Sequence, residues 1–187
     1  MVWLEETVNQ LIRFGIVLGT ICLVATLVLA VTYEVTKPKI EEQFRLEENA
    51  ALKEIVPEAD SFTKKSIDGI EYFEALKGDS LIGYCVKVMG SGYTGYIHMI
   101  VGIDQNGSIK GARVLEHQET PGLGAKIAET KPGEKDPWFL RQFVGKAAKT
   151  VTVKKEIDAI TGATISSKAV TDAINKTAGE FLSKVKR

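Results

Sequence analysis

An apolar run near the amino terminus is the feature that most constrains how this chain can fold. No residue from Phe14 to Tyr33 is charged, and half of them are Ile, Leu or Val. The run matches the roughly 20 residues that an α-helix needs to cross the hydrocarbon of a bilayer. We therefore expect residues 14–33 to form a single transmembrane helix behind an amino-terminal flank, residues 1–13. A cleaved signal peptide is the alternative, with Val28-Leu29-Ala30 as the processing site.

The charges beside this run are nearly balanced. Arg13 precedes it, whereas Lys37 and Lys39 follow it, interleaved with glutamates. Because positively charged flanks tend to stay in the cytoplasm, the pattern leans towards a cytoplasmic position for the rest of the chain. Orientation is therefore only weakly indicated by local charge.

A second helix is expected directly after the span, over residues 34–57. From Lys39 onward, apolar residues recur at helical spacing against a charged face, and Pro57 closes the pattern. These apolar residues are Ile40, Phe44, Ala51, Leu52 and Ile55. The charged face is dominated by glutamate, which argues against attraction to anionic lipid. We expect a stalk or a cover for the domain that follows, with a membrane-lying helix as the alternative.

Residues 58–187 are long enough for one globular domain with a core of its own. After a polar stretch from Glu58 to Asp68 come four runs with strand character, separated by turn signals that include Asn-Gly. The runs are Tyr72–Leu76, Leu81–Val88, Tyr96–Ile103 and Ser108–Leu115. A short helix over Pro137–Phe143, a last strand over Val151–Val153 and a long final helix follow. The sequence thus predicts an α+β fold, an antiparallel sheet with flanking helices.

Composition and motifs argue against several functions. Lysine plus arginine and aspartate plus glutamate number 24 each, so no basic excess favours nucleic acid as a partner. The two cysteines, Cys22 and Cys85, lie far apart, and we expect no metal site. The two histidines, His98 and His117, belong to no recognisable nucleophile–base set, and no nicotinamide or ATP motif occurs. We therefore predict no catalytic residue that acts independently.

One short run near the carboxyl end carries a binding signal, Asp158-Ala-Ile-Thr-Gly-Ala-Thr164. Apolar residues then recur at spacings of three and four, so the run stands at the amino terminus of a helix. Free backbone N–H groups and the positive end of the helix dipole favour a phosphate there. Gly162 and Ala163 leave room for the phosphate, and a hydroxyl could hydrogen-bond it or be esterified by it. The alternative is that these hydroxyls only cap the helix.

A second unusual run, Glu119-Thr-Pro-Gly-Leu-Gly124, follows the fourth predicted strand. Two glycines flank Leu123 just after Pro121, which predicts a tight loop whose backbone is open to a ligand. An ordinary turn before a short helix is the alternative.

These runs resemble segments of the FMN-binding domain family. Asp158-x-x-Thr-Gly-Ala-Thr164 is similar to the family's flavinylation motif, whose last Thr or Ser is joined to FMN through a phosphoester. The resemblance places that bond on Thr164 and makes Asp158 and Gly162 positions that a flavin transferase reads. Glu119–Gly124 is similar to the loop that lines the flavin ring, and Ser91–Tyr96 more weakly resembles a third segment near it. The residues implied to bind FMN are Thr164, Thr161, Gly162, Ala163, Ser166, Ser167, Glu119, Thr120, Gly122, Leu123, Gly124, Lys126, Tyr93 and Tyr96.

Within that family, the order of one span, a helical stalk and one FMN domain resembles the G subunits of Rnf-type complexes. The resemblance implies an electron carrier in an ion-translocating ferredoxin:NAD+ oxidoreductase, with membrane, flavin and iron–sulfur subunits as partners. It also implies an FMN domain on the extracytoplasmic side of the cytoplasmic membrane, against the charge pattern. The alternatives are the C subunit of a sodium-translocating NADH:quinone oxidoreductase, a non-redox assembly module and an independent flavin reductase, which would need a nicotinamide site.

Overall fold

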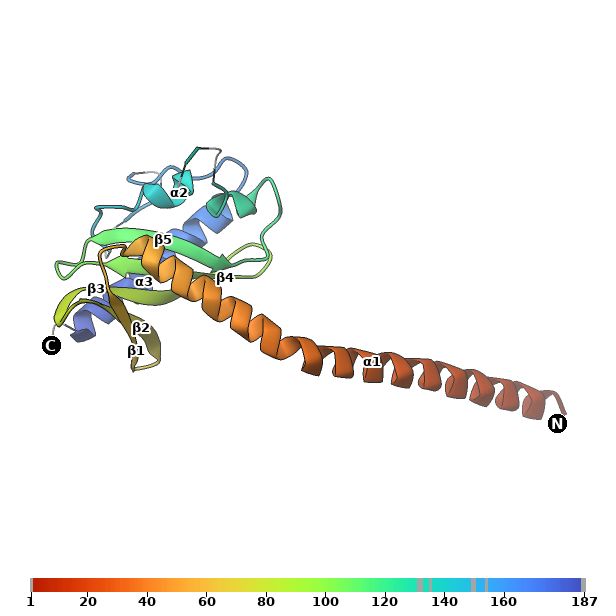
Figure 1. The fold of residues 1–187 in the computed structure, drawn as a ribbon. Coiled ribbons are helices and arrows are strands. Elements are labelled where there is room, and N and C mark those ends of the chain that lie inside the picture. The colour runs from red at the N-terminus through yellow and green to blue at the C-terminus, as the bar shows by residue number, and fades with distance from the viewer. Residues whose placement is uncertain (1, 131–132, 135, 149–150, 154, 186–187) are drawn as a thin grey trace. The chain divides into compact units, whose positions relative to one another are not determined.

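The computed structural model describes residues 2–130, 133–134, 136–148, 151–153 and 155–185, the side chains of residues 2–8 excepted. The chain forms two compact units, Met1–Leu46 and Glu47–Arg187. Helix α1, Val2–Ile55, runs through the first unit and ends in the second (Figure 1).

Within the first unit, α1 presents the apolar run on its surface. Large apolar side chains from Phe14 to Leu29 are more than half exposed, and the helix is long and apolar enough to cross a membrane. Such exposure suits a helix whose solvent is lipid rather than water. The transmembrane helix predicted from the sequence is thus found as a helix of suitable length.

The structure has one continuous helix where the sequence predicted two. Pro38 lies inside α1, although proline removes one backbone hydrogen bond from a helix. In the preceding turn, the Thr36 hydroxyl donates to the carbonyl of Thr32 at 2.8 Å. The carbonyl that loses its helical partner is that of Glu34, four residues before the proline, so the Thr36 hydroxyl does not replace that bond. At the other end, α1 stops at Ile55, two residues before Pro57.

The second unit is built on a five-stranded antiparallel meander in the order β1-β2-β3-β4-β5 (Figure 1). The strands are β1 (Ser61–Ile67), β2 (Ile70–Lys77), β3 (Ser80–Ser91), β4 (Tyr96–Ile103) and β5 (Ile109–Glu116). The four predicted strands are confirmed as β2 to β5. β1 was not predicted, because this edge strand leaves most of its side chains exposed and carries little apolar alternation.

After the sheet come η1 (Gly124–Ile127), α2 (Trp138–Arg141) and α3 (Thr164–Val185). The short helix and the final helix were predicted. The predicted strand over 151–153 is wrong, since only Val153 makes an isolated bridge, with Ile157. The N–H and carbonyl of Val151 are instead bonded to the side-chain amide of Asn175 on α3, the N–H at 3.0 Å. A helix side chain therefore takes the hydrogen bonds that a neighbouring strand would have supplied.

Helices cover both faces of the sheet. On one face α3 packs against β3, and Phe181 contacts Tyr72 and Tyr84 with ring centroids 4.8 and 5.2 Å apart. On the other face the last turns of α1 bury a second cluster (Figure 1). That cluster comprises Ala51, Leu52, Ile55, Val56, Phe73, Ala75, Cys85 and Ile100. The expected cover for the domain is thus supplied by the end of α1, whereas Ile40 and Phe44 remain exposed.

Candidate functional site

A pocket of about 460 Å³ lies beside the amino terminus of α3. This volume falls within the range of small-molecule sites, about 300–1,000 Å³. The pocket draws on three segments: the β3–β4 turn, the loop after β5 with the start of η1, and the turn that opens α3. Its lining residues are Tyr93, Glu119, Thr120, Leu123, Gly124, Gly162, Ala163, Thr164, Ile165 and Ser166.

The turn that opens α3 is held in place by Ser167. This fully buried hydroxyl accepts a hydrogen bond from the N–H of Ile160 at 3.0 Å and donates to the carbonyl of Ala163 at 2.9 Å. Gly162 lies within the turn at a φ of +80°, a conformation that residues with a Cβ rarely adopt. Ser167 therefore stabilises the turn from inside and does not line the pocket.

The carboxylate of Glu119 joins the three segments. Its Oε1 accepts the backbone N–H groups of Tyr93 at 2.8 Å and Thr94 at 3.2 Å. Its Oε2 accepts the hydroxyl of Ser166 on α3 in a short hydrogen bond. Burial raises the pKa of this carboxyl, but the hydrogen bonds from Ser166, Thr94 and Tyr93 outweigh burial and hold the pKa below its usual value. Glu119 is therefore a buried negative charge in the pocket wall.

Two glycines make room for this carboxylate. A Cβ at Gly92 would collide with Oε1 of Glu119, and a Cβ at Gly124 would collide with Oε2 and lie 2.7 Å from the Ser166 hydroxyl. Real Cβ atoms essentially never come so close to a neighbour. The β3–β4 turn and the start of η1 can therefore approach the carboxylate only because both positions lack a side chain.

The three hydroxyls at the start of α3 have different surroundings. Thr164, the first residue of the helix, is exposed in the pocket wall. Ser166 is 2% exposed and donates to Glu119, and Ser167 is fully buried. Thr164 is therefore the one of these three hydroxyls that a bulky reagent can reach.

The structure brings together most of the pocket predicted from the sequence. Of the predicted binding residues, Thr161, Gly122, Lys126, Tyr96 and Ser167 do not line the pocket. Gly122 is a turn residue with a φ of +75°. Tyr96 is 61% exposed at the start of β4. Lys126 lies half-buried in η1.

Asp158 lies just before the pocket, with an exposed side chain. Gln142 holds its backbone on both sides: the Gln142 Oε1 accepts the Asp158 N–H at 2.8 Å, and Nε2 donates to the Asp158 carbonyl at 3.2 Å. The Asp158 carboxylate is therefore exposed on a backbone that Gln142 holds in place.

Two contributors were missed by the sequence analysis. Ile165 lines the pocket and is 55% exposed. It could have been identified from the sequence, because it is an apolar residue that falls outside the buried face of α3. Thr94 supports the wall, because its hydroxyl donates to the carbonyl of Gln118 at 2.6 Å. No spacing pattern identifies such a contact between two loops.

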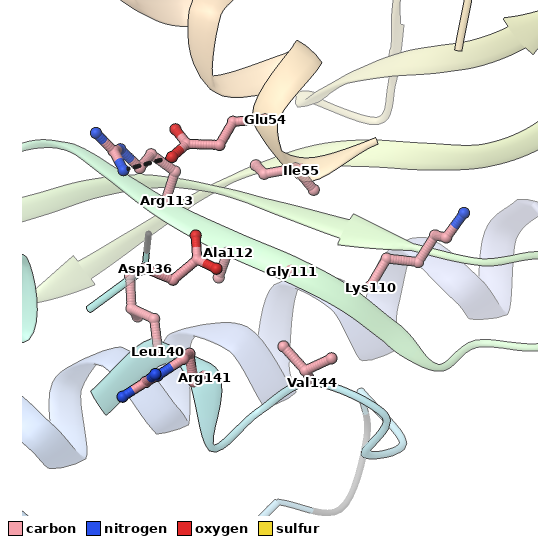
Figure 2. Close-up of a pocket in the computed structure, with 10 residues that line it drawn as sticks. All are labelled: Glu54, Ile55, Lys110, Gly111, Ala112, Arg113, Asp136, Leu140, Arg141 and Val144. Atoms are coloured by element: carbon pink, nitrogen blue, oxygen red, sulfur yellow. Dashed lines mark hydrogen bonds and ion pairs between the residues drawn. The ribbon is translucent and has the colours of Figure 1, made fainter. Parts of the chain in front are cut away.

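A second cavity lies between the end of α1, β5 and α2. Figure 2 shows the Glu54 carboxylate next to the Arg113 guanidinium, with which it forms an ion pair of 3.0 Å; Leu140 and Val144 also line the cavity. Its volume is about 60 Å³, enough for about two water molecules. The cavity is too small for a nucleotide, so the larger pocket is the candidate binding site. Among the described residues, no group of three or more His, Cys, Asp or Glu could hold a metal ion.

Comparisons with known proteins identify the family of the domain that contains this pocket. The model of the FMN-binding domain family matches residues 92–179, which include every residue that lines the larger pocket. The model of the RnfG N-terminal region matches residues 5–55, which lie in α1. The fold and pocket therefore define an FMN-binding domain that follows an apolar helix.

Relatives of similar length make the assignment more specific. The G subunit of the Na+-translocating ferredoxin:NAD+ oxidoreductase complex of Acetobacterium woodii is 36% identical, with 87% of each chain covered. The G subunit of the proton-translocating ferredoxin:NAD+ oxidoreductase complex of Clostridium ljungdahlii is 32% identical, with 83% of each chain covered. This chain belongs to the family of G subunits of ion-translocating oxidoreductase complexes.

Solved structures of similar proteins include the C subunit of the Na+-translocating NADH-quinone reductase of Parabacteroides distasonis. It is 26% identical, covers 60% of this chain and 61% of its own, and has a TM-score of 0.48. NqrC of Shewanella oneidensis is 22% identical with a TM-score of 0.49, and 69% of this chain and 73% of that chain are covered.

Proposed function

We propose that this chain is the membrane-anchored electron-transfer subunit of an ion-translocating ferredoxin:NAD+ oxidoreductase complex, with FMN joined to Thr164 through a phosphoester. One observation supports the attachment site: the Thr164 hydroxyl is exposed in the pocket wall, whereas Ser166 and Ser167 are buried and the exposed Thr161 does not line the pocket. Bound FMN would supply one- and two-electron transfer, which links carriers of different kinds.

The pocket residues fit this cofactor. The first N–H groups of α3 have no partner within the helix and, with the helix dipole, favour a phosphate beside Thr164. Tyr93, Leu123 and Ile165 give the pocket apolar surface and are 72%, 46% and 55% exposed. These residues would hold the ring, and Thr164 would hold the phosphate. The buried carboxylate of Glu119 would keep the walls in register.

We also propose the partners and the location. The two relatives described above are G subunits of ferredoxin:NAD+ oxidoreductase complexes, which supports membrane and iron–sulfur subunits as electron-transfer partners here. The exposed side chain and fixed backbone of Asp158 support its recognition by a flavin transferase during maturation. We place the domain on the extracytoplasmic side, where that transferase and the membrane partners would meet it.

Two other functions are less well supported. The C subunit of a sodium-translocating NADH:quinone oxidoreductase is disfavoured because relatives over 30% identical across most of the chain are G subunits. A non-redox assembly module would not need an exposed threonine at the edge of a pocket of this volume.

Intact-mass measurement of the denatured full-length chain, coexpressed with a flavin transferase, tests the attachment. The wild-type chain should carry the mass of one FMN less one water, and Thr164→Ala should carry none. Thr164→Ser should retain the addition, and Thr161→Ala is the matched control because it removes a neighbouring exposed hydroxyl. An addition that persists in Thr164→Ala, or its absence from wild-type protein of the native membrane, would contradict the proposal.

The side of the membrane can be tested separately. Lys110→Cys, introduced after Cys22 and Cys85 are changed to serine, places a thiol on the partly exposed surface of β5. A maleimide that cannot cross membranes should label it in cells whose cytoplasmic membrane is intact. Labelling only after the membrane is opened would place the domain in the cytoplasm.

A further inference from the structure

The Glu119 carboxylate makes more hydrogen bonds than lining the pocket would require. We propose that Glu119 is a positioning residue for FMN attachment: it ties the pocket segments together and engages the Ser166 hydroxyl, leaving Thr164 to receive the phosphoester. This inference rests on the proposed function and concerns how one hydroxyl is selected among several.

The contacts of Glu119 fix segments that are far apart in the sequence. Its side chain bonds Tyr93 and Thr94 in the β3–β4 turn and Ser166 in α3. Hydrogen bonds that involve a charged group are stronger than neutral ones. The collisions expected of a side chain at Gly92 or Gly124 show how closely both segments surround this carboxylate.

The same carboxylate distinguishes two hydroxyls in one helical turn. Ser166 lies two residues after Thr164, and its type alone would allow esterification. Its side chain, however, is buried and is held there by the hydrogen bond to Oε2 of Glu119, so a bulky phosphate donor cannot reach the oxygen. Ser167 is withdrawn in a similar way by its bond to the Ala163 carbonyl at 2.9 Å. Thr164 is therefore selected for the phosphoester by the exposure of its hydroxyl and not by its residue type.

The attachment step itself balances without a redox change. With a flavin dinucleotide as the donor, Thr164 Oγ1 forms a bond to the phosphorus of the FMN half. The bond from that phosphorus to the bridging oxygen breaks, and the nucleoside monophosphate leaves with that oxygen. The hydroxyl proton passes to the leaving group or to solvent. Glu119 takes no part in these bonds and acts through the geometry of the pocket.

The test compares Glu119→Ala and Glu119→Gln with Glu116→Gln, all in the full-length chain coexpressed with a flavin transferase. Glu116 is exposed at the end of β5 and is the matched control. Peptide mass mapping measures the rate and the site of attachment. Amide hydrogen exchange at Tyr93 and Thr94, in flavin-free protein, measures directly how well Glu119 protects these two N–H groups.

We expect Glu119→Ala to slow attachment at Thr164 by about tenfold, which corresponds to roughly one charged hydrogen bond. Exchange at Tyr93 and Thr94 should become faster, and part of the flavin should appear on Ser166. Glu119→Gln, which keeps the side-chain size, should lie between alanine and wild type and replaces alanine if that variant fails to fold. Glu116→Gln should behave as wild type.

Attachment at the wild-type rate in both Glu119 variants, or unchanged exchange at Tyr93 and Thr94, would overturn the inference. Absence of flavin from the wild-type chain would instead overturn the proposed function. The two failures are therefore distinguishable in one experiment.

Discussion

The Cγ2 methyl of Ile55 lies where a side chain on Gly102 would begin. Ile55 is in the last turn of α1 and Gly102 is in β4, so this contact sets how closely the helix approaches the sheet. Gly111 on β5 faces the same methyl at an ordinary distance, 3.6 Å from the position of an added Cβ. One face of the domain core thus depends on a missing side chain at one position.

Gly102→Ala should destabilise the fold by about 1–3 kcal/mol, the usual cost of overpacking. Ile55→Leu should recover part of this loss, because leucine has no branch at Cβ. Gly111→Ala is the control and should cost less. Thermal unfolding of the detergent-solubilised full chain measures all four proteins. Equal losses for the two glycine variants would show that the contact with Ile55 does not matter.

Ser167→Ala should cost about 1–3 kcal/mol, because it leaves the buried N–H of Ile160 without its acceptor. Ser183→Ala is the control: its hydroxyl bonds the Glu180 carbonyl from an exposed position, so its loss should have little effect. Denaturant unfolding gives the two free energies. Mass mapping should still find the flavin on Thr164 in both variants, since neither serine would carry it.

Lys87→Met should destabilise the domain by about 1–3 kcal/mol, because Lys87 on β3 forms an ion pair with Glu48, which is only 9% exposed in α1. Adding Glu48→Gln should restore most of the loss by removing the stranded charge. Lys184→Met is the control, since its pair with the exposed Asp68 shares no residue with the Lys87 pairs and should contribute less than about 1 kcal/mol. A double variant no more stable than Lys87→Met would refute this account.

Acid should weaken the wild-type fold more than the Glu119→Gln fold. The pKa of Glu119 is lower in the folded chain than the ordinary 4.5, so the ionised carboxylate stabilises the fold above that value. This contribution disappears as the pH falls through the folded-state pKa. Unfolding free energies measured between about pH 3 and 7 should show the difference. Glu58 and Glu71 also have lowered pKa values, but they titrate in both proteins.

The fold could be predicted where apolar alternation and turn residues agree, as in β2 to β5. The edge strand β1 escaped prediction because its sequence, Ser-Phe-Thr-Lys-Lys-Ser-Ile, has few buried positions. The strand predicted over Val151–Val153 was wrong for the opposite reason. Its β-branched residues favour a strand, but the backbone N–H and carbonyl of Val151 bond the side chain of Asn175.

Most residues of the site could be predicted from the sequence, but the contacts between them could not. Sequence motifs pointed to Thr164, Glu119 and Leu123, and the structure places all three in one pocket. The motifs treated Ser166 and Ser167 as equivalent to their neighbours, because a sequence shows a hydroxyl and not its partner. The bond between Ser166 and Glu119 joins residues 47 positions apart, and only the folded chain reveals it.

The end of α1 has a practical consequence for any attempt to detach the domain from the bilayer. A water-soluble fragment must begin at or before Glu47, because Ala51, Leu52 and Ile55 form part of its interior. A shorter fragment starting at Asp60 would expose Phe73, Cys85 and Ile100 to solvent, and the uncovered apolar face of the sheet would promote aggregation.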